Sequence, residues 1–89
     1  MKPYMISYDL TKPGQDYEGL IARLHEIGAV RILWSQWVLR TSANAVQIRD
    51  DLARFIDSND SLLVTGLTGE AAWTRVRVPN DTFKEQIAA

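Results

Sequence analysis

Apolar and polar positions near the start of the chain predict a strand followed by a turn. Residues 5–8 are rich in strand-forming side chains and follow Pro3, a residue that suits the beginning of a strand. The run is followed by Lys12, Pro13 and Gly14, which together are a strong turn signal. We therefore expect the first strand to end at about Asp9.

The hydrophobic spacing then changes to that of a helix. From residue 16 the apolar side chains recur three or four positions apart and form a stripe roughly 120° wide. These side chains are Tyr17, Leu20, Ile21, Leu24 and Ile27. Gly28 supplies a residue that can adopt the left-handed conformation that ends many helices. The pattern predicts a helix over 16–27.

Strict alternation returns after this helix. Apolar side chains alternate with others over 30–34 and again over 36–40, which predicts a hairpin with a short connection at Ser35. Ser42 is a suitable N-cap for a second helix over 43–57, in which apolar residues again have helical spacing.

The last third of the chain contains one clear strand and a weaker tail. Residues 61–67 are almost continuously apolar, as in a strand covered on both faces. Beyond Gly69 the pattern predicts a short strand over 73–78 and a last helical turn over 82–88.

The order β-α-β-β-α-β is typical of the ferredoxin-like split βαβ fold, an α+β architecture with a four-stranded antiparallel sheet and two helices on one face. We expect sheet order 4-1-3-2, one domain over 1–89 with its core in 4–67, and a C-terminal strand extension. The tail, 70–89, would pair with the sheet of a second copy in a homodimer. If Tyr8, Ile32, Trp37 and Leu39 face the helices, the open face carries Ser7, Arg31, Leu33, Val38, Arg40 and Thr65.

Composition narrows the classes of function. The chain is 46% hydrophobic and 24% charged, which is typical of a globular domain, and its formal net charge is −1. Such a charge excludes a histone-like, arginine-rich nucleic-acid binder. The chain has no cysteine and a single histidine, His25, so disulfides and thiolate metal sites are excluded. No targeting or membrane-spanning window is found, and we expect a cytoplasmic protein without a membrane partner.

Carboxylates are the strongest candidates for chemistry. The predicted topology places Asp9, Asp57 and Asp60 near one edge of the sheet, where oxygen ligands would suit Mg²⁺ or Mn²⁺. In a twofold dimer, two Asp9 side chains could share the metal ion. The alternative is that Asp57 and Asp60 bond backbone amides of their own turn, as such residues usually do.

Aromatic and basic residues offer a second possibility. Trp34 and Trp37 flank the predicted hairpin turn and Trp73 lies in the tail; aromatic side chains on a sheet can stack bases, but they more often pack in a core or a dimer interface. Arg75 and Arg77 could form a local basic patch.

Several segments together resemble the CRISPR-associated protein 2 family. They are Ser7-Tyr8-Asp9-Leu10, the helix ending at Gly28, Ser35-Gln36-Trp37-Val38-Leu39 and Asp60-Ser61-Leu62-Leu63-Val64. The resemblance covers residues 4 to about 67 and implies a ferredoxin-like homodimer. Members act as metal-dependent nucleases on RNA or DNA or as dimeric scaffolds for an integrase, and toxins of the virulence-associated protein D type share the fold. The family's strand-one aspartate matches Asp9, which implies a metal ion between the two protomers.

The leading hypothesis is thus a homodimer of this antiviral-defence type that binds nucleic acid, with a Mg²⁺-dependent endonuclease activity as an open question. Asp9 is the catalytic and metal-binding candidate, and Arg31 and Arg40 are the candidate phosphate contacts. The predicted dimer interface contains Leu33, Val38 and Trp73. The alternatives are a non-enzymatic adaptor or inhibitor in a defence or toxin–antitoxin system, binding a protein partner, and a small-ligand regulatory domain.

Overall fold

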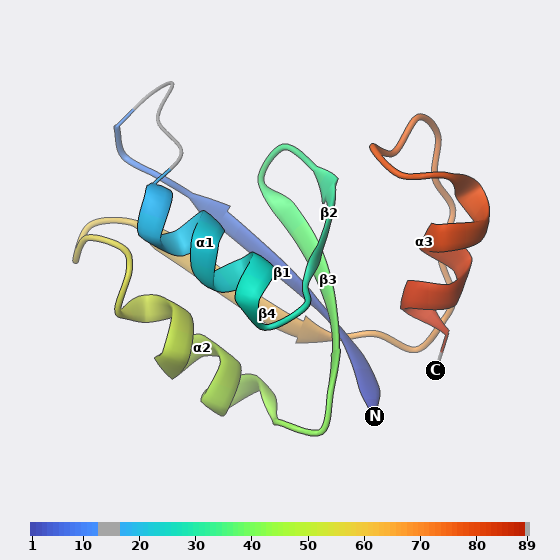
Figure 1. Cartoon of the computed structure of the whole chain (residues 1–89), viewed down its shortest axis with the longest axis horizontal. Coiled ribbons are helices and arrows are strands. Elements are labelled where there is room, and N and C mark those ends of the chain that lie inside the picture. Colours follow the sequence, from blue (N-terminus) through green and yellow to red (C-terminus); the bar gives the residue numbers. More distant parts are fainter. Residues whose placement is uncertain (13–16, 89) are drawn as a thin grey trace.

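The computed structural model describes residues 1–12 and 17–88, which form a four-stranded sheet and three helices (Figure 1). In chain order the elements are β1 (Lys2–Asp9), α1 (Glu18–Glu26), β2 (Val30–Leu33), β3 (Gln36–Thr41), α2 (Ala45–Ala53), β4 (Ser61–Gly66) and α3 (Asn80–Ile87). The sheet order is β2-β3-β1-β4 and every pairing is antiparallel. This confirms the predicted ferredoxin-like α+β fold and its strand order.

The central strand β1 sets the register of the sheet. Its residue Ser7 lies opposite Gln36 of β3, and Asp9 lies opposite Ser61 of β4. The end of β1 is therefore next to the beginning of both neighbouring strands, as the topology predicts.

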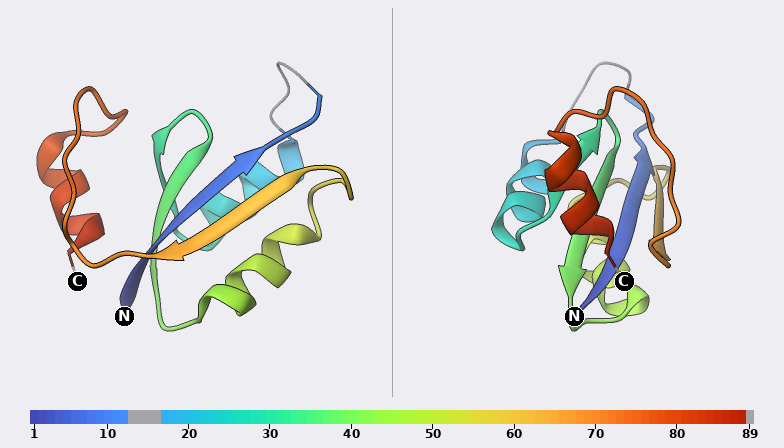
Figure 2. Two further views of the ribbon diagram at one scale, coloured as in Figure 1. Left: turned by 180° about the vertical axis from the view of Figure 1, so that it is seen from behind. Right: turned by 90° about the vertical axis from the view of Figure 1, so that its right-hand side faces the viewer.

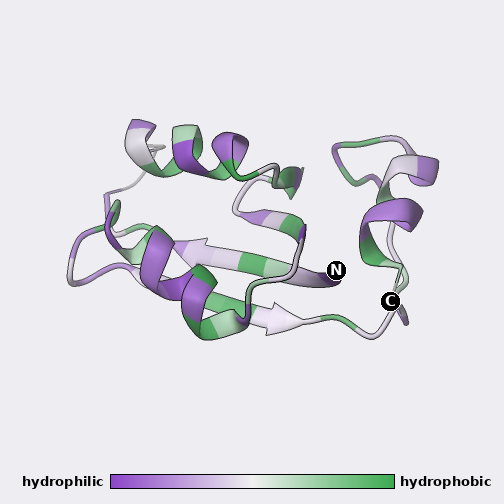
Figure 3. Cartoon of the chain, turned by 60° about the horizontal axis from the view of Figure 1, so that its bottom comes forward, coloured by the Kyte–Doolittle hydropathy of each residue, from purple (hydrophilic) through white to green (hydrophobic). Residues whose placement is uncertain are grey.

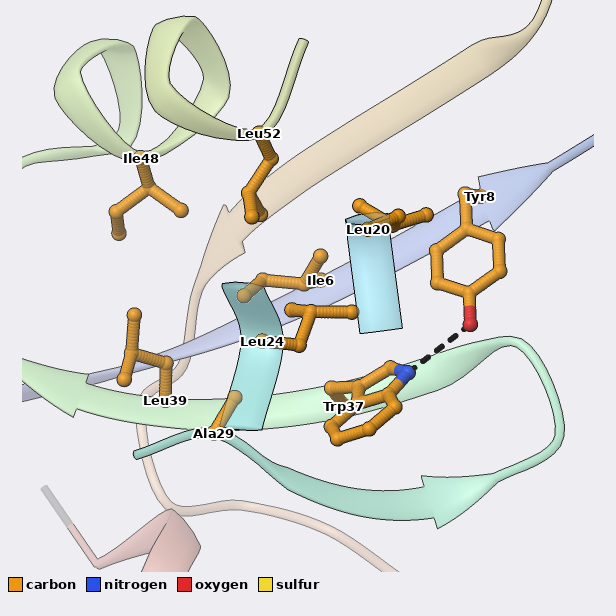
Figure 4. Packing of buried hydrophobic residues seen from close by; sticks show 9 residues of the cluster. All are labelled: Ile6, Tyr8, Leu20, Leu24, Ala29, Trp37, Leu39, Ile48 and Leu52. Carbon is orange, nitrogen blue, oxygen red and sulfur yellow. Dashed lines mark hydrogen bonds between the residues drawn. The ribbon is translucent and has the colours of Figure 1, made fainter. Parts of the chain in front are cut away.

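The main core lies between the sheet and the helices α1 and α2 (Figure 4). Ile6 and Tyr8 point to this side of β1, and Trp37 and Leu39 do so from β3, because side chains alternate along a strand. Leu20, Leu24, Ile48 and Leu52 meet them from the two helices. Figure 3 shows polar and apolar residues on each helix, as expected of amphipathic helices that cover a sheet.

The helix ends differ from the prediction by a few residues. Gly28 follows α1 with φ of +87°, a conformation that favours glycine, so the predicted stop is confirmed. The cap of α2 is Asn44, not Ser42: the Asn44 side chain accepts from Gln47 N at 2.8 Å, and Gln47 Oε1 accepts from Asn44 N at 2.9 Å. The helix is accordingly shorter, Ala45–Ala53, than the predicted 43–57.

The C-terminal tail contains no strand among its described residues, so the predicted strand over 73–78 is wrong. One backbone hydrogen bond joins it to the sheet edge, from Arg77 N to Ile32 O at 2.8 Å. Arg75 has φ of +58°, which interrupts an extended chain, and the tail instead ends in α3. The predicted last helical turn is thus a helix of 8 residues.

The tail places α3 beside the β2–β3 end of the sheet (Figure 2). There it packs on side chains that point away from α1 and α2. Phe83 and Ile87 of α3 pack on Ile32 and Val38 to form a second buried cluster. Ile32 therefore faces α3, not α1 and α2 as predicted. The cause is an irregular register between Arg31 and Leu33 in β2, which exchanges the faces of neighbouring side chains.

Candidate functional site

Asp9 lies exposed at the end of β1, beside a shallow depression of about 380 Å³. Because Ile6 and Tyr8 point into the main core, Ser7 and Asp9 point to the opposite face of the sheet. The lining residues come from the ends of three adjacent strands and the hairpin turn: Ser7, Tyr8, Asp9, Ser35, Gln36, Ser61, Leu62 and Leu63. The sequence analysis expects Ser7 on this open face, and alternation along the strand is enough to place it there.

Asp60 holds together two turns near Asp9. Its Oδ1 accepts from Thr11 N at 2.8 Å and from Thr11 Oγ1 at 3.0 Å, and its Oδ2 accepts from Asp57 N at 2.7 Å. Burial opposes ionisation, but these hydrogen bonds outweigh it and lower the pKa of Asp60. The expectation that Asp60 bonds local backbone amides is confirmed.

Asp57 belongs to the same network. Its Oδ2 accepts from Tyr17 Oη at 3.3 Å and lies 3.8 Å from Lys12 Nζ. Burial and the neighbouring Asp60 raise the pKa of Tyr17, which therefore remains a protonated donor. Neither Asp57 nor Asp60 lines the depression, and in the described residues the three carboxylates do not form one metal-binding group, so their expected convergence on a metal ion is wrong.

The polar side chains that line the depression offer oxygen ligands of the kind that Mg²⁺ and Mn²⁺ prefer. They include one carboxylate, the hydroxyls of Ser7, Ser35 and Ser61, and the amide oxygen of Gln36. In the part of the chain that the structure describes, no group of three or more His, Cys, Asp or Glu residues is placed to hold a metal ion. Among the residues that line the depression, one chain therefore supplies a single charged ligand, Asp9.

Arg31 lies on the side of the main core, not on the open face. Its Nη2 donates to Tyr8 Oη at 3.2 Å, and its Cζ is 4.8 Å from the ring centre of Trp37 and 4.7 Å from that of Trp34. The irregular register of β2 that turns Ile32 outward turns Arg31 inward.

Arg40 holds the end of α3. Its Nη1 donates to the carbonyl oxygens of Glu85 and Gln86, each at 3.3 Å, and to that of Ala88. Arg40 is paired with Pro3 near the start of β1, whereas Asp9 is at its end. The structure therefore does not bring Arg31 and Arg40 together, and Arg40 acts as a helix cap in the single chain.

The three residues predicted for a dimer interface have different surroundings. Leu33 is 41% exposed, but Val38 is fully buried beneath α3 of its own chain. Trp73 is half-buried with its ring 4.5 Å from that of Phe83, and its Nε1 donates to Asn80 at 3.1 Å. Of the three, Leu33 is the exposed residue, Trp73 is partly accessible and Val38 is closed off in the single chain.

Trp34 is the exposed aromatic residue at this end of the sheet. It lies in the turn between β2 and β3 and is 57% exposed. Arg77 of the tail approaches it, with its Cζ 5.4 Å from the ring centre. The alternating pattern identifies Trp34 as a hairpin residue, but the approach of Arg77 depends on the tertiary fold.

Comparison with known proteins adds no family assignment: no protein-family model matches the chain, and no solved structure matches it significantly. None of the helices in 1–12 and 17–88 combines the length and apolar character needed to span a membrane.

Proposed function

We propose that this protein is a homodimer of the CRISPR-associated protein 2 type that binds a nucleic-acid strand at the Asp9 end of its sheet. We further propose that it cleaves that strand with Mg²⁺ or Mn²⁺ held between the Asp9 carboxylates of two copies. The observation that supports this most directly is the exposed Asp9 in an oxygen-lined depression, next to an Asp60 that is engaged in the turns.

The described residues supply the other parts of such a site. The hydroxyls of Ser7, Ser35 and Ser61 can donate to phosphate oxygens, and the amide of Gln36 can do so from the adjacent strand. Asp9 would hold the cation, which supplies charge neutralisation at the phosphate and an acidified water when bound. The rigid register of β1 against β3 and β4 keeps these groups in place.

Cleavage of labelled RNA and DNA oligonucleotides tests the proposal. The wild-type protein is incubated with Mg²⁺, Mn²⁺ or EDTA, and Asp9→Asn is compared with Asp50→Asn, an exposed carboxylate on α2. We expect cleavage that EDTA and Asp9→Asn abolish and Asp50→Asn leaves unchanged. Sedimentation velocity checks that both variants have the wild-type oligomeric state.

Two results would contradict the proposal. Equal cleavage by Asp9→Asn and wild type would show that Asp9 does not take part in cleavage. A protein that is monomeric under all conditions would show that two copies do not share a metal ion, because one chain provides a single carboxylate there.

A further inference from the structure

Trp34 is exposed, whereas the other two tryptophans are packed against other residues. Trp37 is fully buried in the main core, and Trp73 rests edge-on against Phe83. Trp34 projects from the turn that joins β2 to β3 and has 57% of its surface exposed. Neither buried cluster includes it, so core packing does not account for this large aromatic side chain.

Two guanidinium groups lie beside the Trp34 ring. Arg31 Cζ is 4.7 Å from the ring centre and Arg77 Cζ is 5.4 Å from it. Both distances are within the range of cation–π attraction. The turn therefore combines an exposed aromatic ring with two positive charges, although the whole chain has a net charge of −1.

Both arginines are positioned by the fold. Arg31 is anchored from below by its hydrogen bond to Tyr8 and its contact with the buried Trp37 ring. Arg77 is held at the edge of β2 by the bond from its backbone N to Ile32 O. Such a preorganised group loses little conformational entropy when a ligand binds.

An exposed indole with adjacent guanidinium groups fits an unpaired nucleotide. A base can stack on the indole, and the guanidinium group of Arg77 can pair with a neighbouring phosphate. The bases of a continuous duplex are stacked on one another and do not offer their faces. A chain without net positive charge also lacks the electrostatic term that dominates binding to long duplex DNA.

We propose that Trp34, Arg31 and Arg77 form a stacking platform for an unpaired base, so that the ligand is single-stranded nucleic acid. The platform and Asp9 lie at the same end of the sheet. The backbone N of Tyr8, which precedes Asp9, donates to the carbonyl oxygen of Ser35, which follows Trp34, at 3.2 Å. The inference rests on the proposed function for the class of ligand and names the strand form that this site accepts.

Binding measured without cleavage tests the platform. Fluorescence anisotropy in EDTA, with Asp9→Asn as the parent protein, gives the affinity for a labelled 12-nucleotide single strand and for the matching duplex. Trp34→Ala is expected to weaken single-strand binding about tenfold, the effect typical of losing one stacked base, and Trp34→Phe to retain most of it. Val46→Ala, which shortens an exposed apolar residue of α2, is the control and should bind as its parent does.

Arg77→Gln provides a second measurement, of salt dependence. If Arg77 pairs with one phosphate, the slope of log affinity against log salt should become less steep by about 0.7. Unchanged binding by Trp34→Ala, or a parent that prefers the duplex, would overturn the platform, while cleavage that depends on Asp9 would leave the proposed function standing. Conversely, single-strand binding that requires Trp34 supports the platform even if no cleavage is found.

Discussion

The indole Nε1 of Trp37 donates a hydrogen bond of 3.1 Å to the phenol oxygen of Tyr8 inside the main core (Figure 4). Both side chains are almost completely buried. The same oxygen accepts a hydrogen bond from Arg31 Nη2. The guanidinium group of Arg31 also lies against the ring of Trp34 at the surface. One buried oxygen thus connects the core to the exposed end of the β2–β3 hairpin.

Replacing Tyr8 by phenylalanine should destabilise the protein by about 1–3 kcal/mol, because the buried N–H of Trp37 loses its acceptor. Urea unfolding measures the change. Tyr4→Phe is the matched control, since it removes a hydroxyl from a half-buried side chain of the same strand and leaves the Trp37 bond intact. Equal effects of the two variants would show that the Trp37 bond contributes little.

The caps of α2 give a second comparison. Asn44→Ala removes the acceptor for Gln47 N and breaks the capping box, so it should lower the free energy of unfolding by about 1 kcal/mol. Ser42→Ala, two residues earlier, should change it by less than about 0.5 kcal/mol. Urea titrations of both variants test this, and a larger effect at Ser42 would contradict the observed cap.

The sequence predicts the layers well because they depend on local periodicity. Alternation places Tyr8, Trp37 and Leu39 on the helix side of the sheet, and the structure confirms this. The face of Ile32 could not be predicted, because a one-residue irregularity in β2 reverses it and leaves no sign in the hydrophobic pattern.

Part of the candidate site is likewise predictable from the sequence, and part depends on the tertiary fold. The position of Asp9 follows from the end of a strand and from the strand order, both of which are predictable. The separate locations of Arg31 and Arg40, and the covering of Val38, follow from the tail folding onto its own sheet. That packing is a tertiary contact between distant segments, which periodicity alone does not encode.

Asp51 should make stability depend on pH in the acid range. Hydrogen bonds from Arg23, at 2.8–3.1 Å, and then from Arg54 outweigh the effect of burial and hold the pKa of Asp51 below its usual range. A carboxyl group whose pKa is lower in the folded state stabilises the protein above its unfolded pKa of about 3.9. That contribution is lost as the pH falls through the lower, folded pKa.

The difference in unfolding free energy between wild type and Asp51→Asn should therefore be largest above about pH 5 and shrink at lower pH. Urea unfolding from pH 6 to pH 2.5 measures it. Asp60 also has a lowered pKa, but it is present in both proteins and its contribution cancels. A difference that is constant with pH would contradict the Arg23–Asp51 pairing.

Arg40 should control how firmly α3 covers the sheet. Arg40→Met removes the guanidinium donor from the last carbonyl groups of α3, and we expect local opening of that helix to become about fivefold more frequent. Hydrogen–deuterium exchange should then accelerate in α3 and remain unchanged in α1, which packs on the opposite face. Arg49→Met, the same chemical change on the exposed side of α2, is the control. Unchanged exchange in α3 would show that Phe83 and Ile87 hold the helix without Arg40, whereas equal acceleration in α1 and α3 would show that the two buried clusters unfold as one unit.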